Sequence, residues 1–276
     1  MKKIISIILL MINIIPVFAK TDRLEAEYLK NKKHFSMLNP LAESAAEKII
    51  EKSLKKKIGS GKYKAKFSAY TLSSMKKGIF KTIEIQGKDL EIDSIPIPYL
   101  NVKSVSDYNW IDITQNPVIV KTDMELVYQL GLNETSINAA LKQKDYQKFL
   151  DKLNKRAYPL FEMHNVQVRI KNNRAYIIMD YTLPLANSKK VKTFMVSSKF
   201  QAENGCIKPD NINIDKTYGN LQLDKVINLI NLINPLSFTI SQLKENNCQG
   251  RVESVNIVDN IVQVNGRIFV EKYKGE

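Results

Sequence analysis

Apolar residues recur at helical spacing between Asn39 and Ile58, close to the start of the chain. The apolar stripes contain Leu41, Ala42, Ala45, Ala46, Ile49, Ile50, Leu54 and Ile58. Asn39 and Pro40 suit the N-cap and first helical position, and glutamates early and lysines late complement the helix dipole. The pattern predicts an amphipathic helix that ends at Gly59 and Gly61.

The apolar period then changes to two, which is typical of strands. Residues 63–69 and 78–92 alternate apolar with polar positions, so each segment predicts a strand. Residues 95–105 contain Pro96 and Pro98, and proline removes a hydrogen bond from a sheet ladder. We therefore expect this segment at a sheet edge or in a connection. Residues 111–114 and 116–128 continue the β pattern.

The second half of the chain predicts two short helices, three hairpins and one longer helix. Asn133 is a candidate N-cap for the first short helix, and the second follows Gln143-Lys144-Asp145. The hairpins are expected to turn at Asn172-Asn173, Asn204-Gly205 and Asp259-Asn260, and the longer helix, around Ile227 and Ile230, to end near Pro235. Runs of strands with few helices predict an α+β fold with a mostly antiparallel sheet.

The first 19 residues have the pattern of a signal peptide. Lys2 and Lys3 precede an apolar run that closes with Val17-Phe18-Ala19, a typical cleavage site before Lys20. The run is shorter than the roughly 20 residues that span a bilayer. We therefore expect export to the periplasm or the extracytoplasmic face of the envelope, with residues 20–38 as a polar leader and 39–276 as one folded domain. An uncleaved anchor is the alternative.

The formal net charge of +14 favours an anionic partner. An exported protein seldom meets nucleic acid, so anionic lipid or glycan is the expected partner. Lysine is abundant along the whole chain, however, which weakens this inference. The lysine run Lys55, Lys56 and Lys57, followed by further lysines on the next predicted strand, is a candidate membrane-docking rim. A solvated helix face fits the same pattern equally well.

Few residues in the sequence suggest chemistry. Cys206 and Cys248 are expected to form a disulfide in an oxidising compartment, with two unpaired thiols as the alternative. His34 and His164 have no cysteine or histidine at zinc-ligand spacing. The common nucleotide-binding, hydrolase and metalloprotease motifs are missing from the sequence. We therefore expect no catalytic residue, metal or cofactor, and a hydrolase with dispersed residues is the remaining enzymatic possibility.

Two acidic patterns have ordinary structural interpretations. Glu43 and Glu47 stand four residues apart on the first predicted helix, a spacing typical of a solvated helix face. Asp210 and Asp215 lack the central glycine and final glutamate of an EF-hand loop, so we interpret them as turn residues.

Six segments, taken in order, resemble a known family. They are AESAAEKIIEKSL, GIFKTIEIQGKDLEIDSIPIPYL, ETSINAAL, VQVRIKNNRAYI, PLSFTI and VESVNIVDNIVQVNGRI. Their order across residues 40–270 resembles the bacterial LmeA-like phospholipid-binding proteins of the tubular lipid-binding (TULIP) superfamily. The leader and the two cysteines lie outside this resemblance.

The resemblance implies a long, strongly twisted sheet wrapped around a helix, with an elongated apolar groove for acyl chains. It also implies a non-enzymatic carrier or presenter of phospholipid or another acylated lipid, acting in envelope lipid or lipoglycan metabolism. The candidate lipid contacts, which fit a packed core as well, are Ile49, Ile50, Phe67, Ile83, Ile85, Ile227 and Ile230. The alternative is an envelope scaffold whose basic surface binds acidic polymers or a protein partner.

Overall fold

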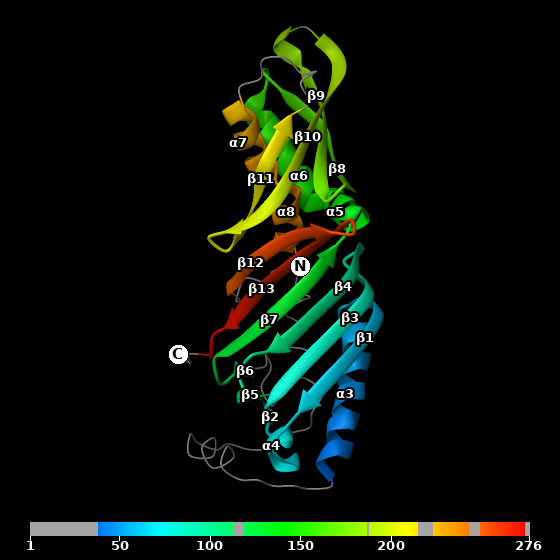
Figure 1. Ribbon diagram of the computed structural model, residues 1–276, viewed down its shortest axis with the longest axis vertical. Coiled ribbons are helices and arrows are strands. Elements are labelled where there is room, and N and C mark those ends of the chain that lie inside the picture. Colours follow the sequence, from blue (N-terminus) through cyan, green and yellow to red (C-terminus); the bar gives the residue numbers. More distant parts are fainter. Residues whose placement is uncertain (1–37, 113–118, 187, 215–222, 243–248, 274–276) are drawn as a thin grey trace.

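The computed structural model describes residues 38–112, 119–186, 188–214, 223–242 and 249–273. These residues form an elongated body in which two large sheets follow one another along the long axis (Figure 1). Both the predicted signal peptide and most of the polar leader lie outside the described residues, as do His34, Asp215 and Cys248. No helix in the described ranges is long and apolar enough to cross a membrane.

The helices are α3 (Leu38–Lys57), α4 (Leu72–Lys76), α5 (Glu134–Leu141), α6 (Lys144–Ala157), α7 (Leu223–Ile233) and α8 (Pro235–Gln242), with one 3-10 turn, η1 (Pro184–Ala186). The strands of the first half are β1 (Gly59–Ser68), β2 (Ile79–Phe80), β3 (Thr82–Ile92), β4 (Ile95–Ser104), β5 (Asn109–Asp112), β6 (Ile119–Val120) and β7 (Met124–Leu132). Those of the second half are β8 (Glu162–Lys171), β9 (Arg174–Leu183), β10 (Ser188–Glu203), β11 (Cys206–Ile214), β12 (Gln249–Val258) and β13 (Ile261–Val270).

The strands form one six-stranded sheet in the order β1-β3-β4-β7-β13-β12, one four-stranded sheet in the order β11-β10-β9-β8, and a small sheet of β2, β5 and β6. Every described strand pair is antiparallel. The predicted α+β class with mostly antiparallel strands is therefore confirmed. The strands are divided among three sheets, whereas the resemblance implied one long sheet.

Strand β4 corrects the prediction for residues 95–105, because it lies in the middle of the six-stranded sheet. Pairing with β3 covers β4 from Ile95 onward, but pairing with β7 begins only at Tyr99. Pro96 and Pro98 therefore lie in a segment with a strand on one side only. A proline is tolerated there because the unpaired side needs no backbone N–H. The two prolines therefore indicate a segment of β4 that is paired on one side only, and not a strand at the edge of the sheet.

The predicted turns and helix starts are mostly confirmed. Backbone φ is positive at both residues of the Asn172-Asn173, Asn204-Gly205 and Asp259-Asn260 turns, a conformation that asparagine, aspartate and glycine tolerate best. Asn133 caps α5 by accepting a hydrogen bond from the Ser136 amide. After the first of these turns, Ala175 and Ile177 of β9 face the core, and Tyr176 and Ile178 are half-buried.

Two helices were missed by the sequence pattern. Helix α7 ends before Pro235 as expected, but the chain immediately starts α8, with Pro235 as its first residue. Asn234 Oδ1 accepts a hydrogen bond from the Ser237 amide at 3.2 Å, which caps this second helix. Helix α4 is a single short turn closed by a capping box between Thr71 and Ser74. At the other end of the chain, α3 begins at Leu38, one residue before the predicted cap.

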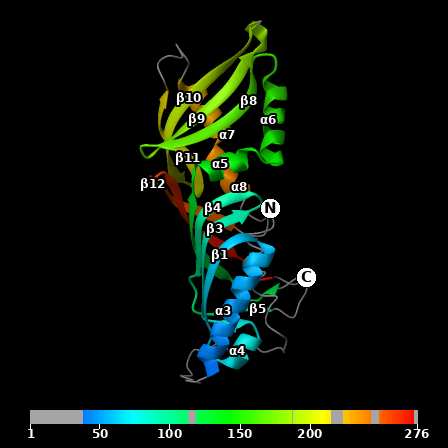
Figure 2. The ribbon, with the colours of Figure 1, turned by 90° about the vertical axis from the view of Figure 1, so that its right-hand side faces the viewer.

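One hydrophobic cluster joins the two large sheets. Helix α5 lies between them and contributes Ile137, Ala140 and Leu141, all nearly fully buried. Tyr146 of α6 is buried beside Phe238 of α8, with ring centroids 4.7 Å apart. Figure 2 shows the same stacking of the two sheets from the side, with α5 and α8 at the junction. The core is therefore continuous along the long axis of the molecule.

Groups from outside the ladders bond to the outer strands of both large sheets. Asn234 Nδ2 and Ser237 Oγ donate to the Ile207 carbonyl of β11 at 2.9 and 3.1 Å. At β12, the Val252 amide donates to the carbonyl of Gly205, in the turn of another hairpin, at 3.1 Å. These contacts occupy one backbone group on each outer strand, which hinders strand addition by other chains there.

Only one of the two cysteines lies among the described residues. Cys206 is the first residue of β11, directly after the Asn204-Gly205 turn, and it is exposed, with no second cysteine among the residues that the structure describes. Cys248 lies outside the described residues. The disulfide between them therefore stays a prediction.

Candidate lipid-binding surface

Helix α3 is fixed along the outer edge of β1 by three of its glutamates. Glu43, Glu47 and Glu51 accept hydrogen bonds from the backbone amides of Ala69, Phe67 and Ala65 at 2.7, 3.0 and 2.9 Å. The interpretation of Glu43 and Glu47 as a solvated face is therefore wrong. The glutamates recur every four residues of α3, about 6 Å along the helix, and their amide partners recur every two residues of β1, about 6.8 Å along the strand. The two spacings are close enough for three successive contacts. We call these three residues the glutamate row.

The residues of α3 that face the sheet increase in size along the helix. Ala42 is half-buried, and Ala46, Ile50 and Leu54 are buried. Ala45, a member of the predicted apolar stripes, is exposed instead. The small residues therefore meet the sheet near the N-terminal half of α3, at the lower end of the molecule in Figure 1.

Four of the seven predicted lipid-contacting residues lie together under α3. Ile50 of the helix, Phe67 of β1, and Ile83 and Ile85 of β3 are all buried members of the apolar cluster. Phe67 pairs with Ile83 across the ladder, and its ring centroid lies 5.5 Å from that of Phe80. This part of the sheet therefore presents an apolar face toward the helix.

The other three predicted residues lie elsewhere. Ile49 is on the outer side of α3 and is 44% exposed. Ile230 is fully buried and Ile227 half-buried on α7, a helix that contacts β11 of the four-stranded sheet. The sequence pattern identified apolar positions correctly, but it did not separate the two sheets or the two faces of α3.

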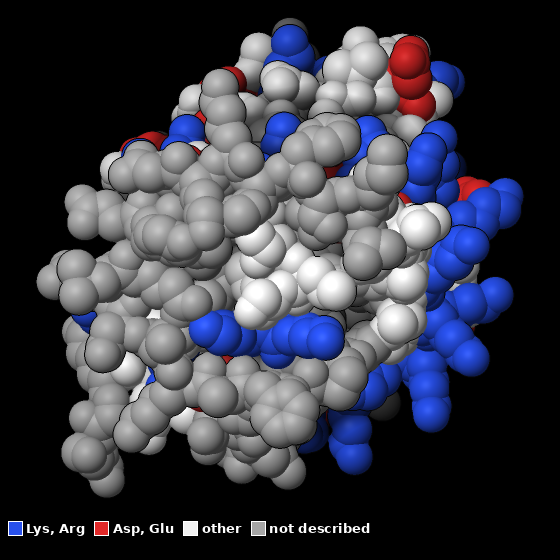
Figure 3. All heavy atoms as spheres, turned by 90° about the horizontal axis from the view of Figure 1, so that it is seen from below, with Lys and Arg blue, Asp and Glu red and all other residues white. Residues whose placement is uncertain are grey.

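The lysines of the predicted docking rim are exposed, but they lie near the middle of the long axis and not at an end (Figure 1). Lys55, Lys56 and Lys57 close α3, and Lys64 and Lys66 extend the charge along β1. Figure 3 shows basic side chains gathered on the side of the molecule where α3 and β1 lie. None of these five lysines forms an ion pair with an acid in the described ranges. The carboxylates of the glutamate row bond to backbone amides and not to these lysines.

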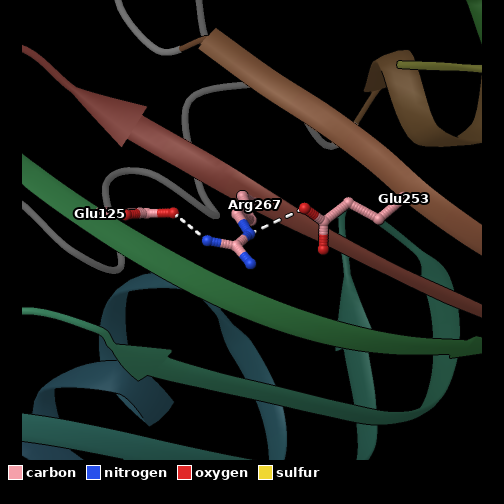
Figure 4. Close-up of polar contacts among 3 residues, drawn as sticks. All are labelled: Glu125, Glu253 and Arg267. Atoms are coloured by element: carbon pink, nitrogen blue, oxygen red, sulfur yellow. Dashed lines mark hydrogen bonds and ion pairs between the residues drawn. The ribbon is translucent and has the colours of Figure 1, made fainter. Parts of the chain in front are cut away.

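The opposite face of the six-stranded sheet carries polar side chains bonded across strands. Arg267 of β13 donates from Nη1 to Glu125 of β7 at 2.6 Å and from Nε to Glu253 of β12 at 2.7 Å (Figure 4). The bond to Glu125, together with Glu253, raises the pKa of Arg267. The Arg267 network joins three strands on this polar face. Tyr128 of β7 packs against the apolar core on the other face, where burial, with Glu253 adding to it, raises its pKa to about 12.

The residues singled out for chemistry are not brought together. His164 is exposed on β8, with Nε2 3.0 Å from Thr182 Oγ1, and Asp210 is exposed on β11. The described residues contain no group of three or more side chains suited to hold a metal ion. Catalysis in this chain stays untested.

Sequence reasoning missed a group of exposed apolar residues at the upper end of the molecule, which contains Tyr158, Leu160, Leu185 and Val191. The available signal was a pair of apolar, proline-containing connections, at Tyr158-Pro159-Leu160 and Pro184-Leu185.

Comparisons of the chain with models of protein families, with curated proteins and with solved structures found no match.

Proposed function

We propose that this protein is exported and binds phospholipid or another acylated lipid without transforming it, as a carrier or a presenting factor of the cell envelope. The observation that carries the proposal is the position of α3. The helix lies along the edge of a sheet whose face toward it is apolar, so an acyl chain held between helix and sheet would contact carbon on both sides. The resemblance to the LmeA-like proteins supports the same ligand, in an elongated TULIP-like groove.

The size gradient of α3 supports a specific location for the acyl chain. Ala42 and Ala46 face the sheet in the N-terminal half of the helix, whereas Ile50 and Leu54 fill the C-terminal half. Each methylene removed from water contributes about 0.8 kcal/mol, so a lipid outside its bilayer requires near-complete enclosure. We place the end of the acyl chain beside Ala46, Phe67 and Phe80.

Lipid retention tests the proposal. The mature chain, purified without detergent, is expected to carry phospholipid detected by native mass spectrometry and by organic extraction. Ala46→Leu places a larger side chain between helix and sheet and is expected to lower the retained lipid by at least about tenfold, since overpacking costs about 1–3 kcal/mol. Ala45→Leu, one residue away on the exposed side, is the matched control and should retain lipid.

Two results would contradict the proposal. If the wild-type chain carries no bound or transferable lipid, the proposed lipid-binding function is wrong. If it releases free fatty acid from added phospholipid, the protein is an enzyme. Export has its own test, because the N-terminal sequence of the mature protein in the periplasmic fraction should begin at Lys20.

A second function, that of an envelope scaffold, is favoured by the unpaired lysines along α3 and β1. Such a scaffold would bind an acidic polymer through Lys55, Lys56, Lys64 and Lys66, and Lys→Gln changes at these positions would abolish that binding in pull-downs with acidic glycan. Retained lipid in the experiment above, with no polymer binding, decides for the lipid-binding function.

A further inference from the structure

Four large apolar side chains are exposed at the end of the four-stranded sheet farthest from α3. Tyr158 and Leu160, which follow α6, are 67% and 64% exposed; Leu185 in η1 and Val191 in β10 are 66% and 54% exposed. The segments that carry them meet at the upper end of the molecule in Figure 1 and again in the side view of Figure 2. We call these four residues the apolar tip.

The two connections of the apolar tip are held side by side. The Leu185 amide donates a hydrogen bond to the Pro159 carbonyl at 2.9 Å. Beside this bond, the rings of Phe161 and Tyr181 pack with centroids 5.4 Å apart. The exposed residues therefore stand on a packed base, and their exposure follows from the fold of both connections together.

The backbone of β10 moves Val191 out of the regular ladder. Ser188 pairs with Leu183 of β9, and the next pair joins Lys192 to Tyr181. Three residues of β10 thus lie opposite one residue of β9. Extra residues of this kind bulge away from the sheet and redirect their side chains, and here the result is one more apolar side chain in solvent.

Cations flank the apolar tip on both sides. Lys155 and Arg156 occupy the last turn of α6, and Lys190 and Lys192 are exposed on β10. None of the four pairs with an acid in the part of the chain that the structure describes. The neighbouring Asp180 accepts hydrogen bonds from Thr193 and Asn165 instead. The charge around the tip is therefore positive.

From this arrangement we infer that the apolar tip is the surface by which the protein docks on an anionic lipid bilayer. Leucine and valine side chains enter the boundary between headgroups and acyl chains, and tyrosine is favoured at that depth. The flanking lysines and arginine then lie at the height of the anionic headgroups. The predicted rim lysines Lys55, Lys56 and Lys57 lack this combination, because the exposed apolar residues of α3, Leu41 and Ile49, lie six or more residues before them. The inference rests on the proposed function only in that a lipid-binding protein must reach a bilayer.

Co-sedimentation with vesicles tests the docking surface. The mature chain is expected to bind vesicles of phosphatidylcholine with phosphatidylglycerol and to bind pure phosphatidylcholine weakly. The triple change Leu160→Ser, Leu185→Ser and Val191→Ser is expected to lower the partition coefficient at least tenfold, since each apolar side chain of this size is worth about a factor of ten when buried. The matched control is Leu41→Ser with Ile49→Ser, which removes exposed apolar side chains from α3 and should leave binding unchanged.

The charges have a separate test. Lys190→Gln with Lys192→Gln is expected to weaken binding to the anionic vesicles about thirtyfold, because each lysine near such a surface contributes about a factor of five. Lys55→Gln with Lys56→Gln is the control with the same loss of charge. Thermal unfolding followed by circular dichroism should be unchanged in all four variants, because every altered side chain is exposed.

The outcomes separate docking from lipid retention. Undiminished vesicle binding by the tip variant, or an equal loss in the α3 controls, overturns the inference. A wild-type chain that is dimeric by light scattering and becomes monomeric in the tip variant also overturns it, because the tip then binds a second copy. A tip variant that retains lipid but loses vesicle binding supports the docking inference. A wild-type chain that carries no lipid but docks through the tip also supports the docking inference, and it contradicts the proposed lipid-binding function.

Discussion

Helix α3 runs along β1 with three glutamates, whereas α5 and α6 meet the outer strand of the other large sheet, β8, with two asparagines and one glutamate. Asn138 Oδ1 accepts from the Val168 amide, and its Nδ2 donates to the Val168 carbonyl, both at 2.8 Å. Asn154 makes the same pair of bonds with Met163 at 2.8 and 2.7 Å. Glu134 accepts from the Ile170 amide at 3.1 Å.

The difference lies in what each side chain can offer to a strand. A carboxylate only accepts, so the glutamate row bonds to amides and leaves the carbonyls of β1 without a partner from the helix. An asparagine amide accepts and donates, and therefore reproduces the hydrogen bonds of a neighbouring peptide group. The glutamate row also repeats one contact three times at matched spacing. Helix α3 is thus held on β1 by one kind of contact, a charged carboxylate that accepts from a strand amide, made three times. Strand β8 is held by individual pairs of hydrogen bonds at separate positions.

The largest effect is expected from removing the whole glutamate row. Glu43→Ala, Glu47→Ala and Glu51→Ala together leave three strand amides without partners, at about 1–3 kcal/mol for each fully buried amide and less where water enters. We expect the free energy of unfolding to fall by about 3–5 kcal/mol in urea titrations. The exposed β1 edge should also increase aggregation, which light scattering can follow.

Lys48→Ala with Lys52→Ala is the control for this experiment. Both lysines are exposed on the same helix, and changes at such positions usually stay within about 0.5 kcal/mol. A triple glutamate variant as stable as this control would mean that the three hydrogen bonds do not hold α3 in solution.

Single substitutions then compare one contact of each kind. Asn138→Ala removes an acceptor and a donor from the buried Val168 and is expected to cost about 2 kcal/mol, whereas Glu47→Ala removes one acceptor and should cost about 1 kcal/mol. Asn138→Asp keeps the acceptor but sets a carboxylate oxygen against the Val168 carbonyl, so its stability should fall at least as far as that of Asn138→Ala. Equal losses for Asn138→Ala and Glu47→Ala in urea titrations would remove the distinction between the two edges.

The smallest effect concerns alkaline pH and the six-stranded sheet. Burial raises the pKa of Tyr63 and Tyr128 from 10.0 to about 12. The folded state therefore favours the neutral phenol, so its contribution to stability is complete below pH 10 and is lost as the pH rises toward 12. At pH 11 the loss from Tyr128 is about 1 kcal/mol.

Urea titrations at pH 8 and pH 11 check this expectation. The fall in unfolding free energy between the two should be smaller by about 1 kcal/mol in Tyr128→Phe than in wild type. The same change at the exposed Tyr273 is the control and should leave the fall as in wild type. An identical fall in Tyr128→Phe and wild type would show that the phenol ionises as readily in the folded state.

Features encoded by neighbouring residues could be predicted from the sequence. The turn at Asn172-Asn173 and the cap at Asn133 depend on the conformational preferences of one or two residues, and both were predicted correctly. Features that depend on which strands become neighbours could not. Pro96 suggested an edge strand because the pattern does not show that β7 stops short of it.

The same distinction between local features and features that depend on neighbouring strands applies to the candidate site. The apolar character of Ile50 and Phe67 was apparent from periodicity, but the sheet to which Ile230 belongs was not. Glu47 has the spacing of a solvated helix face, and only the position of β1 beside α3 gives its carboxylate a backbone partner. The apolar tip was missed because Leu160 and Leu185 are 25 residues apart and share no periodic pattern; the backbone contact at Pro159 brings their segments together.

The Asn204-Gly205 turn constrains how this chain can diverge. A side chain at Gly205 would meet Arg251 Cγ at 3.1 Å with φ at +75°, and its carbonyl already accepts the Val252 amide of β12. One turn therefore closes a hairpin of one sheet and protects the edge of the other. Insertions or substitutions there would disturb both sheets at once, whereas the exposed Asp259-Asn260 turn can change length at little cost. Among related chains, we expect the first turn to keep its length and its glycine while the second varies.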